Sequence, residues 1–251
     1  GLVAYYPFTD GSLLDFSTQG NNAAQIGAPP IVLDRHNSIG LNDARTLSSG
    51  NTINTQFSNG FPTGTQDFTL SLWLRRFPVG SFGAGERVIV ANQSEKQFEL
   101  RVNNNGQLRF YTGAFGTSDC TTPVLTWIPS TWYHVVVTRS SNRIIIYRDG
   151  ALSQTGPLIV DGGNSAVPSQ RFLTFGDSPG VFPAVTTDDL TGSIDDVRLY
   201  NYALTGPNVS ALHDKEKPLP GLITPVDKTT GLTAYFPVSA SLYGDTSNIV
   251  H

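Results

Sequence analysis

The segment from Ser130 to Gly156, STWYHVVVTRSSNRIIIYRDGALSQTG, constrains the fold more than any other part of the chain. Its first part, WYHVVVTR, is apolar on both faces at its centre, which is typical of a strand in the middle of a sheet. The polar triplet SSN leads into RIIIYR, and Asp149 with Gly150 forms a two-residue turn into ALSQT. The segment therefore predicts three consecutive antiparallel strands.

Other stretches also alternate with the period of a strand. In DFTLSLWLRR the leucines at 70, 72 and 74 share one face, and Trp73 lies on the other. KQFELRV and QLRFY flank the turn NNNG and predict a hairpin. Charged residues make up only 14% of the chain, whereas Gly and Pro number 25 and 16, which favours short strands joined by turns. We expect an all-β protein with one short helix in TGPNVSALHDKEK, capped by Thr205.

The opening of the chain recurs near its end. GLVAYYPFTDGSLLDFS at the start is matched by GLTAYFPVSASLYGDTS from Gly231 onward. Between them, EKPLPGLITPVDKTT is rich in Pro and polar residues and has no periodic face, which is typical of a linker. The sequence predicts a complete domain over residues 1–215, a linker over 216–230 and the first strand of a second, truncated repeat over 231–251. Chance similarity between two edge strands is the alternative.

Charge and hydropathy argue against two classes of partner. The net charge of −4 comes without basic clusters, so nucleic acid is not expected as a partner. No apolar run approaches the roughly 20 residues that a membrane helix needs, so membrane insertion is not expected. Cys120 is the only cysteine, so no disulfide forms within the chain.

Several motifs, taken in order, resemble the laminin-G-like, concanavalin A-like lectin/glucanase jelly-roll family. They are GLVAYYPFTDGSLLDFSTQGNN, FTLSLWLRR, WYHVVVTR, IIIYRDGAL and GSIDDVRLYNYALT. The resemblance implies a jelly-roll sandwich of two antiparallel sheets. Members of the family serve as glycan-binding modules, adhesion domains and accessory domains of secreted enzymes, which implies an extracellular or cell-surface location.

Catalysis by this domain is not expected. The family's glucanases carry an E-x-D-x-x-E strand, and retaining glycosidases need two carboxylates about 5 Å apart. The chain has only four glutamates, at 86, 95, 99 and 216, and none forms that motif. His134 follows two aromatic residues in a predicted central strand, so we interpret it as a packed core histidine.

One acidic residue raises the question of a metal. Strand alternation in GSIDDVRLY places Asp195 on the face of Val197 and Leu199, which is the core face if that side is apolar. A buried carboxylate has to be ion-paired, hydrogen-bonded or bound to a metal, and Ca²⁺ accepts carboxylates and carbonyls in irregular geometry. The alternative is a carboxylate held by backbone amides without metal.

The family resemblance extends this hypothesis to a set of ligands. Structural calcium sites in such sandwiches join the first strand, a neighbouring loop and the last strand. The resemblance therefore implies Ca²⁺ held by Asp195 with Asp10 or Asp15 and backbone oxygens near Gly50. Members commonly carry an Asp where Ser49 stands here, which weakens the analogy at that position.

Two surfaces are candidates for ligand binding. Sugars are bound by aromatic platforms together with planar polar groups. The polar side of the predicted strands offers Trp73, Arg75, Arg101, Arg109 and Tyr111, and the long loops offer Phe115, Asp177 and Phe182. The alternative is that Trp73 packs into the sandwich and the arginines only solvate a face.

These observations favour a noncatalytic, extracellular adhesion or carbohydrate-binding module of a multidomain repeat protein. Its expected partners are glycans or cell-surface and matrix proteins. A purely structural surface-protein repeat also fits the recurring opening, because arrays give adhesive proteins length and avidity. An accessory domain of a secreted glycoside hydrolase is a further alternative.

Overall fold

The computed structural model describes residues 1–36, 44–62, 65–76, 87–92, 98–112, 120–159, 172–177 and 189–218. All of them belong to the first of the two units into which the chain divides, Gly1–Pro220. The recurring opening at 231–251 and most of the predicted linker lie outside the described residues. The predicted division into a domain, a linker and a truncated repeat therefore stays a prediction.

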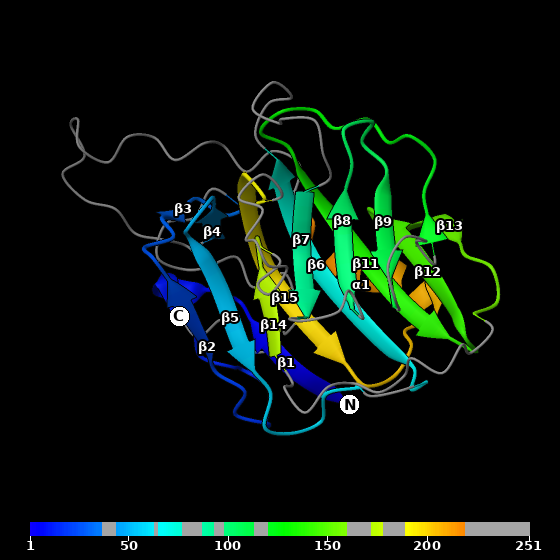
Figure 1. Cartoon of the computed structure of the whole chain (residues 1–251), viewed down its shortest axis with the longest axis horizontal. Helices are drawn as coiled ribbons and strands as arrows, with labels where there is room; N and C mark the ends of the chain where they lie inside the picture. The colour runs from blue at the N-terminus through cyan, green and yellow to red at the C-terminus, as the bar shows by residue number, and fades with distance from the viewer. Residues whose placement is uncertain are drawn as a thin grey trace, which may run out of the picture. The chain divides into compact units, whose positions relative to one another are not determined.

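The described strands form two antiparallel sheets that face each other, which confirms the predicted all-β jelly-roll sandwich (Figure 1). The eight-stranded sheet has the order β13 (Ala151–Thr155), β12 (Arg143–Arg148), β11 (Trp132–Ser140), β6 (Phe68–Arg76), β15 (Gly192–Tyr200), β4 (Ala44–Leu47) and β3 (Ile31–Val32), and β1 (Leu2–Tyr6) also pairs with β15. The seven-stranded sheet has the order β10 (Cys120–Thr121), β9 (Leu108–Tyr111), β8 (Glu99–Val102), β7 (Arg87–Asn92), β14 (Phe172–Phe175), β5 (Thr52–Gln56) and β2 (Ala23–Ile26). A short 3-10 turn, η1 (Thr9–Gly11), follows β1.

The three strands predicted from the segment 130–156 are confirmed as β11, β12 and β13, which pair in sequence at one edge of the eight-stranded sheet. The predicted hairpin is confirmed as β8 and β9, with Glu99 opposite Tyr111. Both predictions succeed because local alternation and a tight turn together fix the pairing.

The core lies between the two sheets and is built by alternate residues of each strand. Leu70, Leu72 and Leu74 of β6 face it, as predicted, and Trp73 does not belong to it. Aromatic rings fill one part of the core, where the centroids of Phe68 and Phe98 are 4.8 Å apart. Because each sheet buries its apolar side, most polar residues of the strands point away from the core.

The predicted alternation in β15 is wrong at Asp195, because the strand contains a bulge. Asp196 has a φ of 47°, and the pairing with β6 shifts register between Asp195 and Arg198. The extra residue leaves Val197 and Leu199 in the core, whereas Asp195 pairs with Trp73 on the outer face. A β-bulge changes the side of the sheet to which a side chain points, while the strand stays paired with its neighbours.

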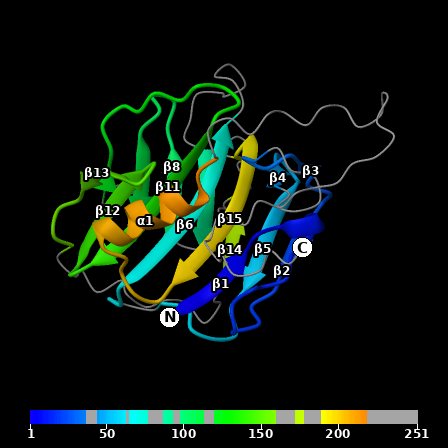
Figure 2. The ribbon, with the colours of Figure 1, turned by 180° about the vertical axis from the view of Figure 1, so that it is seen from behind.

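The single helix of the described residues, α1 (Gly206–Glu216), lies across the outer face of the eight-stranded sheet (Figure 2). Thr205 is its N-cap, as predicted, and its hydroxyl accepts from the amide of Asn208. Val209 is buried against Val136 of β11 and Tyr147 of β12. The helix therefore turns this part of the outer face into a second buried layer.

Candidate functional site

Asp195 lies in a network of buried charges between the eight-stranded sheet and the segments that cover it. Its Oδ2 lies 2.6 Å from Nη1 of Arg35, and its Oδ1 accepts from the amide of Asp196 at 2.7 Å. Nη2 of the same guanidinium lies 2.5 Å from Oδ2 of Asp196. Arg198 bridges Asp196 and Glu216 at 3.1 and 2.6 Å. Each of these charges therefore has an opposite charge beside it.

Burial and neighbouring charges shift the pKa values in this network in opposite directions. Burial, reinforced by the charge of Asp196, raises the pKa of Asp195 well above its ordinary value. Burial would also raise the pKa of Asp196, but Arg198 and Arg35 hold it below its ordinary value. The hydroxyl of Tyr5 donates to Asp196 at 2.5 Å. Asp196 is therefore the charged centre of the network.

Asp15, a predicted calcium ligand, is occupied by hydrogen bonds. Its carboxylate accepts from the hydroxyl of Ser17 at 2.7 Å and from three backbone amides at 2.8 to 2.9 Å, those of Tyr5, Ser17 and Asn21. This is the metal-free arrangement that sequence reasoning weighed as the alternative at Asp195. Here it fixes the loop that follows β1.

The other predicted calcium ligands lie in separate places. Asp10 is exposed in η1. Gly50 lies in the turn between β4 and β5, and its carbonyl oxygen lies against Gly27, so close that a Cβ on Gly27 would be only 2.2 Å from that oxygen. The described residues contain no group of three His, Cys, Asp or Glu side chains that could hold a metal. At Asp195 the residues do not fit Ca²⁺, because the guanidinium of Arg35 already supplies the cation. Calcium binding itself stays a prediction.

Trp73, predicted as a ligand platform, is only 2% exposed. Its indole nitrogen donates to Glu216 at 2.9 Å, and its ring is stacked with His134 and His213 at centroid distances of 5.1 and 5.7 Å. Burial, with a contribution from His213, lowers the pKa of His134 to about 3. These side chains attach α1 to the sheet, and Trp73 has no free ring face for a sugar.

Arg101, Arg109 and Tyr111, the other predicted sheet residues, share the outer face of the seven-stranded sheet. Arg101 is directly opposite Arg109, and Glu99 is directly opposite Tyr111. Oε1 of Glu99 lies 2.6 Å from Nη2 of Arg101 and also accepts from its Nε at 2.7 Å. The structure therefore brings these three residues together and separates them from Trp73 and Arg75, which lie in the other sheet.

Three buried oxygen atoms on this outer face have no hydrogen-bond partner within the described part of the chain. They are Oδ1 of Asn54, Oγ1 of Thr174 and Oε2 of Glu99. Thr174 of β14 is directly opposite Asn54 on one side and Ala91 on the other, and Ala91 is directly opposite Glu99. We call Asn54, Thr174, Ala91 and Glu99 the acceptor row.

Sequence reasoning did not single out Asn54 or Thr174, and only part of their arrangement is visible in the sequence. Alternation in TINTQ and FLTF marks both side chains as lying opposite the apolar ones. Their cross-strand pairing, in contrast, depends on strands far apart in the chain.

Asp177, predicted as a loop residue for ligand binding, lies beside Asp189. Burial, partly opposed by a hydrogen bond with Ser49 and reinforced by Asp177, raises the pKa of Asp189 to about 6. The side chain of Asp177 is hydrogen-bonded to Asp189 and therefore favours the protonated form of Asp189. The remaining predicted loop residues, Phe115 and Phe182, lie outside the described residues.

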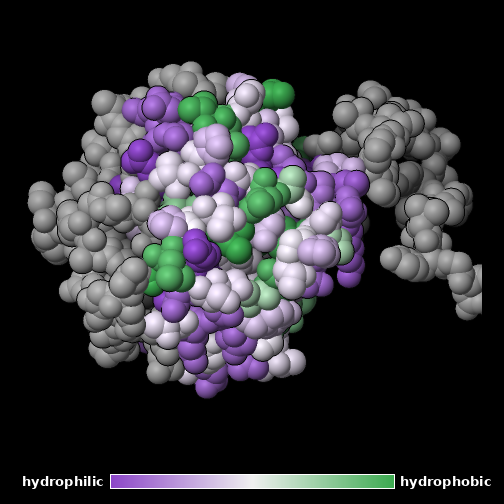
Figure 3. Space-filling model, turned by 90° about the vertical axis from the view of Figure 1, so that its right-hand side faces the viewer, coloured by the Kyte–Doolittle hydropathy of each residue, from purple (hydrophilic) through white to green (hydrophobic). Residues whose placement is uncertain are grey.

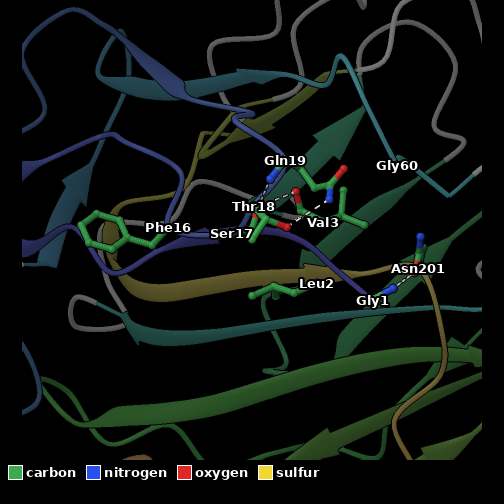
Figure 4. Close-up of a pocket in the computed structure, with 9 residues that line it drawn as sticks. All are labelled: Gly1, Leu2, Val3, Phe16, Ser17, Thr18, Gln19, Gly60 and Asn201. Atoms are coloured by element: carbon green, nitrogen blue, oxygen red, sulfur yellow. Dashed lines mark hydrogen bonds between the residues drawn. The ribbon is translucent and has the colours of Figure 1, made fainter.

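A pocket of about 300 Å³ lies beside β1 (Figure 4). Its lining contains no charged side chain and consists of Gly1, Leu2, Val3, Phe16, Ser17, Thr18, Gln19, Gly60 and Asn201. Phe16 is 57% exposed at one end, and Asn201 accepts from the amino group of Gly1 at the other. Sequence reasoning did not select Phe16, because nothing in DFSTQG distinguishes a surface aromatic from a packed one.

Hydrophilic and hydrophobic residues are interspersed on the side of the molecule near β9 and β13. Figure 3 shows apolar residues there in separate areas between polar ones. No helix among the described residues is long and apolar enough to span a membrane.

A family model described as the concanavalin A-like lectin/glucanases superfamily matches residues 48–210. None of the curated proteins that were compared matches the chain. The fold itself has many solved counterparts.

The binding domain of Paraclostridial Mosquitocidal Protein 1 is 18% identical with a TM-score of 0.68, over 85% of this chain and 52% of that one. The binding domain of botulinum neurotoxin DC, solved in complex with rat synaptotagmin II, is 16% identical with a TM-score of 0.65, over 85% and 51%. A structure of botulinum neurotoxin type C, whose cell entry depends on interaction with two ganglioside molecules, is 15% identical with a TM-score of 0.64, also over 85% and 51%. The chain thus spans about half the length of these structures, and such low identities show likeness of fold alone.

Proposed function

The chain belongs to the concanavalin A-like lectin/glucanases superfamily, and on that premise we propose that it is a noncatalytic module that binds a glycan or protein ligand on the outer face of its seven-stranded sheet. The observation that carries this proposal is the acceptor row, because buried oxygens without partners are rare in folded proteins and call for a ligand or water. Arg109 and Tyr111 flank the row and add a planar cation and an aromatic ring.

The same face supports the noncatalytic part of the proposal. Glycoside hydrolysis by the common mechanisms needs two carboxyl groups about 5 to 9 Å apart on either side of the scissile bond. Along the acceptor row Glu99 is the only carboxylate, and Arg101 pairs with it. A lone, ion-paired carboxylate can accept hydrogen bonds from a ligand, but it cannot serve as both acid and nucleophile.

The solved structures support glycan and protein as the ligand classes. Cell entry of botulinum neurotoxin type C depends on interaction with two ganglioside molecules, and the binding domain of botulinum neurotoxin DC forms a complex with rat synaptotagmin II. We extend to this chain only the general role of ligand binding. Such ligands are displayed on cell surfaces, so we place the module outside the cell, within a multidomain protein. An accessory role in a secreted hydrolase and a purely structural repeat are the alternatives.

The test is binding of the purified protein to an array of glycans, followed by calorimetric titration with each bound glycan. Arg109→Ala and Tyr111→Ala are expected to weaken binding. Arg143→Ala serves as the matched control, because it removes an arginine from the other sheet. Wild-type protein that binds no glycan and no cell-surface protein would overturn the proposal, as would binding that depends on Phe16 of the pocket instead.

A further inference from the structure

We propose that Asn59 is a site of spontaneous covalent modification, at which the side-chain amide is lost and an aspartate or isoaspartate takes its place. Such a reaction is independent of the proposed function and occurs at the rim of the pocket beside β1. The sequence contains the susceptible dipeptide twice, as Asn59-Gly60 and Asn105-Gly106. Glycine after asparagine favours the reaction, because its missing side chain leaves the amide nitrogen unhindered and the backbone free to turn.

The reaction needs only water as a co-reactant. The backbone nitrogen of the glycine loses its proton and attacks Cγ of the asparagine, which closes a five-membered succinimide ring and expels ammonia. Water then opens the ring at either of its two carbonyl groups. One opening gives an aspartate in a normal backbone, and the other gives an isoaspartate, whose main chain runs through the former side chain. Both products add one negative charge to the protein.

The reacting groups of Asn59 and Gly60 are accessible. Both residues are exposed, in the segment that follows β5. Buried Asn21 holds the main chain there, because its Oδ1 accepts from the amide of Ser58 at 2.9 Å and its Nδ2 donates to the carbonyl oxygen of Asn59 at 3.2 Å. In a trans peptide the N–H points opposite to the C=O, so the N–H of Gly60 points away from Asn21. No group in the described part of the chain accepts a hydrogen bond from it.

The hydrogen bond from Asn21 also favours the chemical step. A donor on the carbonyl oxygen of Asn59 polarises the peptide group, which makes the N–H of Gly60 more acidic. The deprotonated nitrogen is the nucleophile, so this contact increases the amount of the reactive form. Asn21 is itself fixed to β1, because its Nδ2 also donates to the carbonyl oxygen of Val3 at 2.8 Å. One side of the peptide is therefore held and the other is left to react.

Asn105-Gly106, in contrast, is protected by its turn. Asn105 is as exposed as Asn59, and the glycine of each dipeptide has a positive φ, 72° in the first and 83° in the second. Gly106, however, is buried, and its N–H donates to the carbonyl oxygen of Asn103 at 2.9 Å. A Cβ on Gly106 would lie only 2.6 Å from the carbonyl oxygen of Leu125, so the turn has little room to rearrange. The fold therefore makes two identical dipeptides unequal in reactivity.

The modification changes the pocket beside β1. Gly60 lines that pocket, and no charged side chain does (Figure 4). Either product therefore places a negative charge at a neutral rim. An isoaspartate also inserts a carbon atom into the main chain between the amide and the carbonyl of residue 59, both of which are hydrogen-bonded to Asn21. We expect the isoaspartate form to melt at a lower temperature than the fresh protein.

The test is incubation of the folded protein at pH 8 and 37 °C, followed by peptide mapping in a mass spectrometer that resolves each asparagine. Asn59 is expected to lose its amide at least tenfold faster than Asn105. In concentrated urea, where the turn and the contacts of Asn21 are lost, the two rates should become similar. Asn105 therefore serves as the matched control within the same molecule.

Two variants complete the experiment. Asn59→Gln should abolish the more acidic form that isoelectric focusing detects in the incubated protein. Asn59→Asp, which has the charge and a normal backbone, should melt with the fresh protein and above the purified isoaspartate form. Equal rates at Asn59 and Asn105 in the folded protein overturn the inference, as does an Asn59 that stays intact while the unfolded chain reacts. An acidic form that persists in Asn59→Gln also overturns it.

Discussion

The guanidinium of Arg35 and the carboxylate of Asp195 lie 2.6 Å apart, and both side chains are buried. Arg35 comes from the segment after β3, and Asp195 comes from the bulged strand β15. An ion pair of this kind joins two distant parts of the chain. Its energetic importance lies mainly in what happens when one partner is missing.

Arg35→Met is expected to destabilise the protein by about 3–5 kcal/mol, because it removes the guanidinium that lies between the buried carboxyl of Asp195 and the buried charge of Asp196. Urea unfolding at pH 7 measures the change. Arg143→Met, which replaces an exposed arginine of β12, should change stability by less than about 0.5 kcal/mol. The double variant Arg35→Met with Asp195→Leu should recover much of the loss. A loss below about 1 kcal/mol in the single variant would contradict the pairing.

Calcium chloride is expected to have the same effect on the melting temperature whether or not Asp195 is present. The reason is that Arg35 and the amide of Asp196 already occupy both oxygens of that carboxylate. Differential scanning calorimetry of the wild type and Asp195→Asn, with calcium or with EDTA, tests this. A calcium-dependent rise in the wild type that disappears in the variant would show that Asp195 does bind the ion.

Acid is expected to destabilise the protein through His134, whose pKa is lowered from 6.5 to about 3 in the folded state. Below pH 6.5 His134 is protonated in the unfolded chain but stays neutral in the folded protein, so stability falls as the pH falls from 6.5 towards 3. This one group should contribute a loss of about 2 kcal/mol between pH 6.0 and 4.5.

The contribution of His134 is isolated by comparison with the double variant His134→Phe with Ser71→Ala. Ser71 is included because its hydroxyl is hydrogen-bonded to the histidine at 2.8 Å. Urea unfolding at the two pH values should show a smaller loss in the variant. Equal losses would mean that other groups cause the acid sensitivity.

Asp189→Asn is expected to raise the melting temperature at pH 8 and to have little effect at pH 4. Because the pKa of Asp189 is raised to about 6, the folded protein holds its proton more tightly than the unfolded chain does. The stability that this provides is fully present below the ordinary pKa of 3.8 and is lost as the pH rises through about 6. A variant that is less stable than the wild type at pH 8 would argue against a raised pKa of Asp189.

Trp73→Ala is expected to cost about 3–5 kcal/mol of stability without a specific effect on ligand binding by the folded fraction. The side chain is almost fully buried under α1, so its loss creates a cavity there. Phe16→Ala, which removes an exposed ring, should cost less than about 1 kcal/mol. Thermal unfolding and glycan titration of both variants separate the two effects.

The strands were predictable where the information is local. In β11 to β13, apolar runs and the Asp149-Gly150 turn determine both the elements and their pairing. Alternation also placed Arg101 and Arg109 together on one outer face. The sequence of β15 did not reveal its bulge, because IDDVRL can alternate in either phase and only packing decides which residue is left over.

The sites were less predictable because they depend on tertiary contacts. Alternation placed Trp73 correctly on the face away from the core, but the helix that buries it comes more than a hundred residues later. Arg35 lies in a segment without periodic signal, so its role as the partner of Asp195 was not visible. The acceptor row required the register of four strands, which no local pattern supplies.

The contacts of Glu216 have a mechanical consequence. Glu216 ends α1 and is joined to Trp73 of β6 and Arg198 of β15, two strands with neighbours on both sides. Tension applied to the chain beyond the helix would reach the middle of the sheet before it could peel away an outer strand. Under load, the domain should therefore resist and then unfold as a unit.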